Sequence, residues 1–234
     1  MVSGAPVALP SGEQLRASAA SSGELNGRTL LAAVLVASTQ PAAVLDVGCK
    51  SGWLLSHLAR QTGAPTLLGV DRDRTHLPGP DGRLRAVVGD ARRLPVAAGR
   101  FDAVTMFDVI EHLPRGTEPE ALAEAATALC PGGLLFVSTP ADWLPGTVLD
   151  PARWLIGHRH YPRARILDLV RTACLEPIVA ETRGNWSDVV GLPLLYASTR
   201  LGLPMPARSW FRRWANREYG RPGRYTHFVV ARKP

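Results

Sequence analysis

The stretch Val44-Leu45-Asp46-Val47-Gly48-Cys49-Lys50-Ser51-Gly52 passes from a short apolar run into a turn that contains two glycines. Glycine tolerates positive φ and lets the backbone approach a ligand closely. The leucine spacing in residues 53–61 indicates that this turn opens a helix. In an open α/β sheet, ligands bind at the carboxyl ends of the strands, where the first amides of a helix can receive polar groups. The stretch therefore predicts a strand–turn–helix unit with a ligand site at its turn.

The glycine spacing excludes two common phosphate-binding motifs. The dinucleotide fingerprint G-x-G-x-x-G requires glycine where this chain has Lys50 and Trp53. A phosphate loop requires Gly-Lys-Ser/Thr after four intervening residues, and the stretch does not have it. The turn is therefore expected to receive a different ligand.

Apolar strands and helical stretches alternate along the rest of the chain. Strands are predicted at residues 43–47, 66–70, 84–88, 101–106, 134–138, 176–181 and 226–231, and helices at 28–38, 53–61, 119–129 and 166–172. Pro131-Gly132-Gly133 is expected to end the helix at 119–129 before the fifth strand. Short apolar strands without strict alternation are typical of a parallel sheet that is covered on both faces. We therefore predict a Rossmann-like α/β fold, with a mostly parallel seven-stranded sheet and helices on both faces.

Length and composition favour one globular domain. A chain of 234 residues, 46% hydrophobic and 20% charged, can bury a core and suits one α/β domain with a modest elaboration. Its three cysteines lie far apart, which argues against a disulfide framework and favours a reducing compartment. The early apolar run at residues 30–37 is too short to span a membrane, and Glu13 and Glu24 precede it, unlike the basic start of a signal peptide. We therefore expect a cytoplasmic protein.

Charge is distributed unevenly. Residues 1–150 carry 12 Lys and Arg against 15 Asp and Glu, whereas residues 151–234 carry 15 against 5. A basic C-terminal third suits an anionic substrate, an acidic membrane surface or nucleic acid. The alternative is a solvated arginine-rich face without a partner.

Residues 46–52 resemble the first motif of class I S-adenosylmethionine-dependent methyltransferases, Asp-x-Gly-x-Gly-x-Gly, with Lys50 in place of the middle glycine. Further segments resemble that family's motifs in the same order: Leu68-Gly69-Val70-Asp71, Gly89-Asp90-Ala91, Phe107-Asp108-Val109-Ile110-Glu111-His112, Leu129-Cys130-Pro131-Gly132-Gly133-Leu134 and His158-Arg159-His160-Tyr161. Motifs in one order are far more specific than any single one. The resemblance covers roughly residues 28–182 and the last strand, and it is to the small-molecule and quinone-biosynthesis type.

The resemblance implies S-adenosylmethionine as the cofactor. Asp71 is then expected to accept hydrogen bonds from the ribose hydroxyls, and Asp90 from the adenine amino group, although aspartate is also a common turn residue at strand ends. Lys50 is expected either near the methionine carboxylate or pointing to solvent, at a steric cost if its φ is positive. The full set of expected cofactor contacts is Asp46, Gly48, Cys49, Lys50, Gly52, Asp71, Arg72, Asp90, Ala91 and Phe107.

Methyl transfer asks the protein mainly to hold the acceptor in line with the donor. A hydroxyl acceptor also needs a general base, for which histidine is the usual choice near neutral pH. His112, His158 and His160 are candidates, and His112 and His160 are the predicted catalytic residues; a structural role beside the cofactor is the alternative for His112. Arg159 and Tyr161 are candidates for orienting the acceptor. No metal is predicted, because the histidines lack i,i+4 spacing with a carboxylate partner.

Residues 185–219 are the least family-like part and mix tryptophan, leucine and arginine. In relatives this position forms a lid or a wall of the acceptor pocket. Peripheral contact with an anionic membrane surface is one alternative, and a helical pair with its arginines in water is another. Prolines at 193, 204 and 206 are expected to interrupt a long amphipathic helix, which favours the lid. We predict a flexible lead-in or N-terminal cap at 1–27 and a methyltransferase domain at 28–234, with the lid or acceptor-pocket insertion at 185–219.

The predicted function is methyl transfer to a small molecule of lipid-like, quinone-like or natural-product type. The alternative is a catalytically inactive methyltransferase-like binding module that acts through its basic C-terminal part, which Lys50 favours and the intact Asp71 and Asp90 oppose. A nucleic-acid acceptor is disfavoured. Residues 107–110 lack the Pro-Pro-aromatic turn of amino-methylating DNA enzymes, and Cys130-Pro131 reverses the Pro-Cys order of cytosine enzymes. The sequence leaves the acceptor, the methylated atom and the oligomeric state open.

Overall fold

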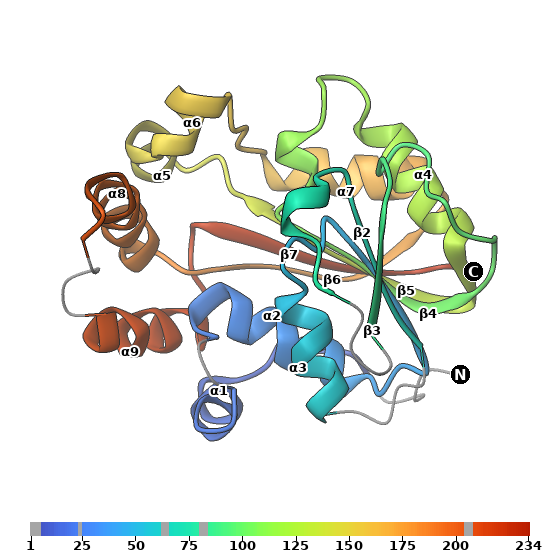
Figure 1. Ribbon diagram of the computed structural model, residues 1–234, viewed down its shortest axis with the longest axis horizontal. Coiled ribbons are helices and arrows are strands. Elements are labelled where there is room, and N and C mark those ends of the chain that lie inside the picture. The colour runs from blue at the N-terminus through green and yellow to red at the C-terminus, as the bar shows by residue number, and fades with distance from the viewer. Residues whose placement is uncertain (1–5, 23–24, 62–65, 80–83, 204–207) are drawn as a thin grey trace.

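The computed structural model describes residues 6–22, 25–61, 66–79, 84–203 and 208–234. Within them, seven strands form one sheet in the order β3-β2-β1-β4-β5-β7-β6 (Figure 1). The strands are β1 Ala43–Val47, β2 Thr66–Asp71, β3 Leu84–Val88, β4 Phe101–Phe107, β5 Leu129–Pro140, β6 Glu176–Arg183 and β7 Thr226–Arg232. β7 pairs antiparallel with β5 and β6, and the remaining pairs are parallel. The predicted mostly parallel seven-stranded sheet is confirmed.

Helices cover both faces of this sheet. They are α1 Gly12–Ala19, α2 Gly27–Ser38, α3 Trp53–Gln61, α4 Glu118–Ala128, α5 Leu144–Leu149, α6 Pro151–Ile156, α7 Arg163–Thr172, α8 Trp186–Leu201 and α9 Arg208–Tyr219, with short 3-10 helices η1 Arg74–His76 and η2 Ile110–His112. Buried residues of α4 and α7 join one apolar core, whereas those of α1, α2 and α3 join a second core on the opposite face. Figure 1 shows these two helical layers on either side of the strands. The predicted covering of both faces is therefore confirmed.

Part of the N-terminal lead-in forms a packed helix. α1 begins with a capping box in which Gln14 N donates to Ser11 Oγ and Ser11 N donates to Gln14 Oε1. Leu15 is fully buried, and α1 contacts α2 and α9. These contacts hold residues 12–19 against the main domain. The division at residue 27 stays a prediction.

Two proline-containing segments differ from expectation. The helix ends at Ala128, but β5 begins at Leu129 and not at the expected Leu134. Phe101 pairs with Leu129 and Ala103 with Leu134, so the residues of β5 between them bulge out of a ladder that continues. Pro193 lies inside α8, which runs unbroken to Leu201. Packing of α8 on α5, α6 and α9 compensates for the backbone hydrogen bond that a proline removes. The expectation of an interruption was therefore wrong at this position, whereas Glu24, Pro204, Met205 and Pro206 lie outside the described residues.

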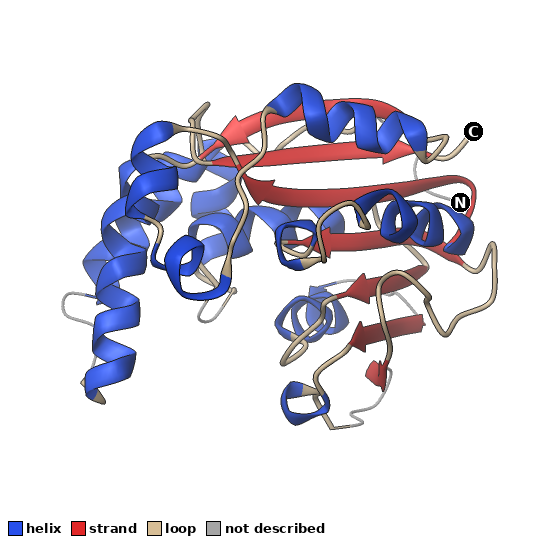
Figure 2. Ribbon diagram, turned by 90° about the horizontal axis from the view of Figure 1, so that it is seen from above, coloured by secondary structure: helices blue, strands red, loops and turns tan. Residues whose placement is uncertain are grey.

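Four helices gather beyond the carboxyl ends of the parallel strands (Figure 2). α5 and α6 follow β5, and α8 and α9 connect β6 to β7. α8 contacts the other three helices, and the predicted helical insertion before the last strand is confirmed. Among the described residues, no helix has the length and apolar character needed to cross a bilayer.

Candidate active site

The register of the sheet brings the ends of β1 to β4 to one edge. Val47 lies opposite Val70, and Asp71 opposite Val88. A cavity of about 440 Å³ opens at this edge, which is within the usual range for small-molecule sites. It is lined by Val47, Gly48, Lys50, Val70, Asp71, Arg72, Asp73, His76, Gly89, Asp90, Ala91, Arg92, Asp108, Val109, His112, Leu113 and Pro114.

The turn after β1 requires glycine at two positions. Gly48 has a φ of +76°, and a Cβ there would lie 2.6 Å from Val109 Cγ2. Gly52 has a φ of +71°, and its Cβ would lie 2.8 Å from Pro78 Cγ. Lys50 also has a positive φ, of 44°, which costs a residue with a side chain about 1 kcal/mol. The lysine therefore occupies a backbone position suited to glycine, and its exposed side chain borders the cavity.

Two carboxylates follow β2 and β3, and local hydrogen bonds orient both. Asp71 accepts hydrogen bonds from the amides of Lys50 and Asp73, each at 2.9 Å. Asp90 accepts from the backbone amide of Arg92 at 2.9 Å and from its guanidinium Nη2 at 2.6 Å. These hydrogen bonds from Arg92 lower the pKa of Asp90 to about 2. A carboxylate offers about four lone-pair sites, so both acids keep acceptor capacity for a ligand.

Asp108 also lines the cavity and was not among the expected site residues. It has a φ of 55°, and its side chain accepts from Ser138 Oγ at 2.9 Å and pairs with Arg28 Nε at 3.0 Å. Arg28 belongs to α2, so this ion pair holds α2 against the cavity edge. The sequence feature that could have identified Asp108 is its position directly after β4. Arg92 also lines the cavity, and its position two residues after Asp90, the acid that follows β3, could have identified it.

Asp46 and Cys49, two of the expected cofactor contacts, lie behind the cavity wall. Asp46 is buried in β1 and accepts a hydrogen bond from Thr105 Oγ1 at 2.6 Å. Burial raises the pKa of Asp46 to about 7, although the hydrogen bond from Thr105 lowers it. The nearby charge of Asp71 adds to the rise. Cys49 is fully buried against Gly69, and this burial raises the pKa of its thiol to about 12. Both side chains pack behind the turn that follows β1.

Gly52 and Phe107 also lie outside the cavity lining. Gly52 closes the turn at the start of α3, where Ser56 N donates to its carbonyl at 2.8 Å. Phe107 packs against Phe228, with ring centroids 6.5 Å apart. Of the expected cofactor contacts, the structure brings Gly48, Lys50, Asp71, Arg72, Asp90 and Ala91 together around the cavity.

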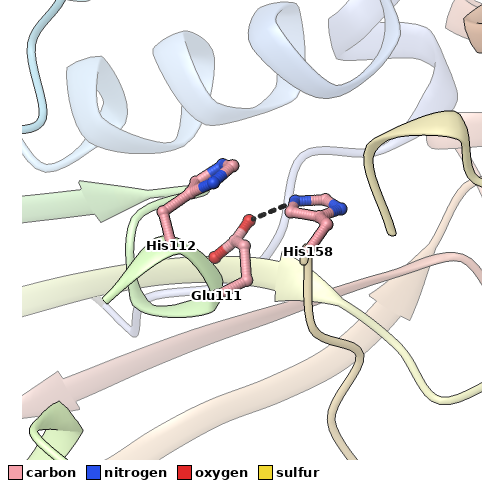
Figure 3. A group of neighbouring side chains, drawn as sticks. All are labelled: Glu111, His112 and His158. Atoms are coloured by element: carbon pink, nitrogen blue, oxygen red, sulfur yellow. Dashed lines mark ion pairs between the residues drawn. The ribbon is translucent and has the colours of Figure 1, made fainter. Parts of the chain in front are cut away.

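η2 places two neighbouring side chains on opposite sides of the wall. Glu111 is buried, whereas His112 is exposed and lines the cavity. The ring of His112 lies 4.7 Å from that of His158, centroid to centroid (Figure 3). The protein that packs against part of the His112 ring desolvates it, and together with the charges of His158 and Lys50 this lowers the pKa of His112 to about 4. His112 is therefore neutral at physiological pH.

His158 is held between two buried carboxylates. Its Nδ1 lies 2.5 Å from Asp150 Oδ2, and its Nε2 lies 3.5 Å from Glu111 Oε1 (Figure 3). Burial alone would lower the pKa of His158, but these two partners raise it to about 9. Burial likewise works against ionisation of Asp150, yet the hydrogen bonds from His158 and His160 hold its pKa well below the ordinary value. His158 is therefore an imidazolium at neutral pH.

The structure does not bring His160 to the cavity. Its side chain is 1% exposed, its Nδ1 lies 3.0 Å from the carbonyl oxygen of Ala141, and its Nε2 lies 3.0 Å from Asp150 Oδ2. Both ring nitrogens are thus occupied by acceptors of the protein itself. An acceptor molecule would have to displace these contacts to reach the ring.

Arg159 and Tyr161 are also engaged by the protein. Arg159 Nη2 donates to the carbonyl of Ile110 at 2.6 Å and pairs with Glu118 at 3.0 Å. Tyr161 is buried, and its hydroxyl lies 2.9 Å from Glu118 Oε1. These contacts anchor η2 and with it the position of His112.

The described residues include two groups whose potential ligand atoms all lie within 4.8 Å of one another: Glu111, His112 and His158, and Asp150, His158 and His160. Sequence spacing missed them because their members come from η2, from the start of α6 and from the segment after it. In the second group, the close contacts of Asp150 with both imidazoles already satisfy the atoms that would bind a cation. The absence of a metal stays a prediction.

Comparison with known proteins adds three findings. Residues 24–215 match the family model described as a methyltransferase domain. The methyltransferase GfsG of Streptomyces halstedii is 35% identical over 103 residues, which cover 41% of this chain and 36% of that protein. The ubiquinone biosynthesis O-methyltransferase of Xanthomonas axonopodis is 40% identical over 108 residues, which cover 42% of this chain and 43% of that protein. The matched part is therefore less than half the length of either curated relative.

A solved structure shares the fold at low sequence identity. Geranyl diphosphate methyltransferase, in complex with geranyl diphosphate and sinefungin, superposes with a TM-score of 0.61 and is 14% identical. The alignment covers 88% of this chain and 79% of that one.

Proposed function

Because the chain belongs to the methyltransferase-domain family, whose cofactor is S-adenosylmethionine, we propose that it transfers a methyl group from this cofactor to a small-molecule acceptor. The observation that supports this most directly is the cavity itself. Asp71 and Asp90, at the ends of adjacent strands, line the same hollow as the glycine turn at Gly48. A donor that needs hydroxyl and amino recognition beside a close backbone approach fits this set of groups.

In this proposal the residues around the cavity bind the cofactor. Asp71 accepts from the ribose hydroxyls, and Asp90 accepts from the adenine amino group beside Arg92. Gly48 leaves room for close approach, since a Cβ there would meet Val109. When bound, the cofactor supplies a methyl group that its sulfonium already activates. Asp46, Cys49, Gly52 and Phe107 act by shaping the turn and the strands behind it.

His112 is the proposed general base for a hydroxyl acceptor. It is exposed in the cavity and neutral at physiological pH, so its ring can take the acceptor's proton. The imidazolium of His158 beside it opposes a second positive charge, which keeps His112 unprotonated before the reaction and makes it a weaker base during proton transfer. His160 is a positioning residue, because it reaches the site only through Asp150, which holds His158.

The proposed acceptor is of lipid-like, quinone-like or natural-product type. One curated relative is named a ubiquinone biosynthesis O-methyltransferase, and one protein of the same fold is named a geranyl diphosphate methyltransferase. Residues 185–219, which contain α8 and α9, are assigned here to a lid or wall of the acceptor pocket. Their place beyond the carboxyl ends of the strands supports this assignment (Figure 2).

Calorimetric titration with S-adenosylmethionine tests the cofactor site. The full chain is expected to bind in about the micromolar range, and Asp71→Ala is expected to weaken binding by at least about tenfold, since it removes the hydrogen bonds of a charged acceptor. Asp168→Ala is the matched control, because Asp168 is an exposed aspartate on α7, outside the cavity lining. Absence of binding by the folded chain, or an equal loss in both variants, would contradict the proposal.

Methyl transfer is tested separately from binding. Labelled S-adenosylmethionine is offered with hydroxylated compounds of quinone-like, lipid-like and natural-product type. Transfer of the label to any of them supports the enzyme. Tight cofactor binding without transfer to any of them would favour the inactive binding module.

A further inference from the structure

The four helices beyond the carboxyl ends of the strands carry an unusual amount of exposed apolar surface. We call the exposed apolar side chains of α5, α6, α8 and α9 the helical apolar surface; its most exposed members include Leu144 at 74%, Trp154 at 70%, Leu201 at 69% and Ile156 at 63%. Outside residues 144–210, the large apolar side chains that are exposed among the described residues are Val87 and Val88 of β3. Exposed apolar groups concentrated in one region mark an interaction site.

The helices that carry these side chains are contiguous. α8 contacts α5, α6 and α9, and Trp154 Nε1 donates to the carbonyl of Val148 at 2.9 Å, which ties α6 to α5. The rings of Trp143 and Trp186 lie 5.3 Å apart and join the start of α5 to the start of α8. Figures 1 and 2 both show the four helices together at one end of the molecule. The helical apolar surface is therefore one region rather than scattered residues.

The charge of the same helices has one sign. Arg153, Arg200, Arg213 and Arg217 are exposed on them. Of the acids in these helices, Glu218 is buried and accepts hydrogen bonds from Ser187 and Trp214, and Asp188 is only partly exposed. The four helices thus present apolar and cationic groups without an exposed carboxylate, although Asp142, just before α5, is exposed.

We propose that this surface docks the protein on an anionic lipid membrane. Apolar side chains enter the boundary between headgroups and acyl chains, where tryptophan is favoured, and arginines bind the anionic headgroups. A second copy fits less well, because a two-fold interface brings the same surface onto itself and these helices offer no exposed carboxylate to pair with the arginines. A nucleic acid would match the arginines and leave the aliphatic side chains without a partner. This docking does not involve the cavity residues, so the proposal does not depend on the proposed cofactor site.

Vesicle flotation of the full chain tests the proposal. The protein is expected to float with vesicles of phosphatidylcholine and phosphatidylglycerol, to bind vesicles of phosphatidylcholine alone much more weakly, and to be released by salt. Arg153→Glu with Trp154→Ser is expected to weaken binding by at least about tenfold. Arg85→Glu with Val87→Ser makes the same charge reversal and likewise replaces an exposed apolar side chain by serine, but on β3, and is expected to bind as the wild type does.

Further measurements keep the test decisive. If the double variant does not fold, Leu144→Ser is measured in its place. It removes one exposed apolar side chain on a different helix and is expected to weaken binding. Failure to float with phosphatidylglycerol, or equal binding to both vesicle types, would overturn the proposal. A dimer in sedimentation velocity that becomes a monomer in the Arg153→Glu, Trp154→Ser variant would identify a second copy as the occupant and overturn it as well. Titration with S-adenosylmethionine is expected to be unchanged in all of these variants, which separates this inference from the proposed function.

Discussion

The cavity edge at the ends of β1 to β4 and the four helices beyond it are built in different ways. At the cavity edge, the two acids that follow β2 and β3 have partners close in sequence or on an adjacent strand: Asp90 is held by Arg92, and Asp71 by the amides of Lys50 and Asp73. The helices instead depend on contacts between segments that follow different strands. Charge separates them too, because the carboxylates of Asp71 and Asp90 line the cavity, whereas the charged side chains that are exposed on the four helices are arginines. The proposed cofactor site is therefore specified largely by strand ends, whereas the proposed acceptor side has to be assembled from separate segments.

The two regions meet at a pair of histidines. His112 comes from η2, directly after β4, and His158 from the segment after α6. Their rings lie 4.7 Å apart, and their pKa values are moved in opposite directions, to about 4 and about 9. The proposed catalysis therefore depends on the junction between the regions.

The largest expected effect is on turnover and comes from His112→Gln. Loss of the proposed base is expected to lower kcat by about 10²–10⁴-fold for a hydroxyl acceptor found by screening. Cofactor affinity is expected to stay unchanged, because the glutamine leaves Asp71 and Asp90 in place. His76→Gln, which alters another exposed histidine of the cavity wall, serves as the control. Equal turnover by His112→Gln and wild type would break the proposed link between the two regions.

The next effect concerns stability and its dependence on pH. The pKa of folded His158, about 9, lies above the ordinary 6.5, so its contribution is fully present below pH 6.5 and is lost as pH rises through 9. The wild type is expected to lose about 3 kcal/mol of unfolding free energy across this window. His158→Gln is expected to remove that dependence, as measured by urea unfolding at a series of pH values.

His76→Gln is again the control for this measurement and is expected to keep the pH dependence of the wild type. A His158→Gln curve with the same fall between pH 6.5 and 9 would show that the fall belongs to other groups. The helices would then not rely on His158 for their attachment to the cavity edge.

The smallest expected effect sharpens the description of the cavity edge. Lys50→Gly is expected to stabilise the protein by about 0.5–1 kcal/mol, because glycine adopts the positive φ of 44° at lower cost. Lys50→Ala removes the same side chain but keeps a Cβ, so it is expected to bring no such gain. Thermal unfolding compares the two variants. Unaltered cofactor affinity in both would exclude a contact between Lys50 and the methionine carboxylate.

Much of the cavity edge could be predicted from the sequence. Strand ends were predictable because apolar runs stop at residues such as Val47 and Val88, and acids that follow parallel strands must meet at one edge. The side-chain orientation within the turn was less accessible. The pattern could not show that Cys49 points into the core while Lys50 stays exposed, because both residues occupy the same glycine-containing turn.

The assembled region was predicted much less well. α5 and α6 are short helices, of 6 residues each, and give almost no periodic signal. Asp150 caps α6 through a hydrogen bond from Ala152 N and also holds His158 and His160, and only the folded chain brings these roles together. His160 was expected at the acceptor, yet both its nitrogens face acceptors within the protein. Sequence neighbours of His158 therefore did not reveal its partner Glu111, which comes from η2.

Hydrogen–deuterium exchange of the full chain, with and without S-adenosylmethionine, tests most directly whether the cavity edge alone binds the cofactor. Protection by the cofactor is expected at residues 48–52, 71–73 and 89–92, with little change in α5 and α6. Strongest protection within α5, α6, α8 or α9, with residues 71–73 and 89–92 unchanged, would contradict it.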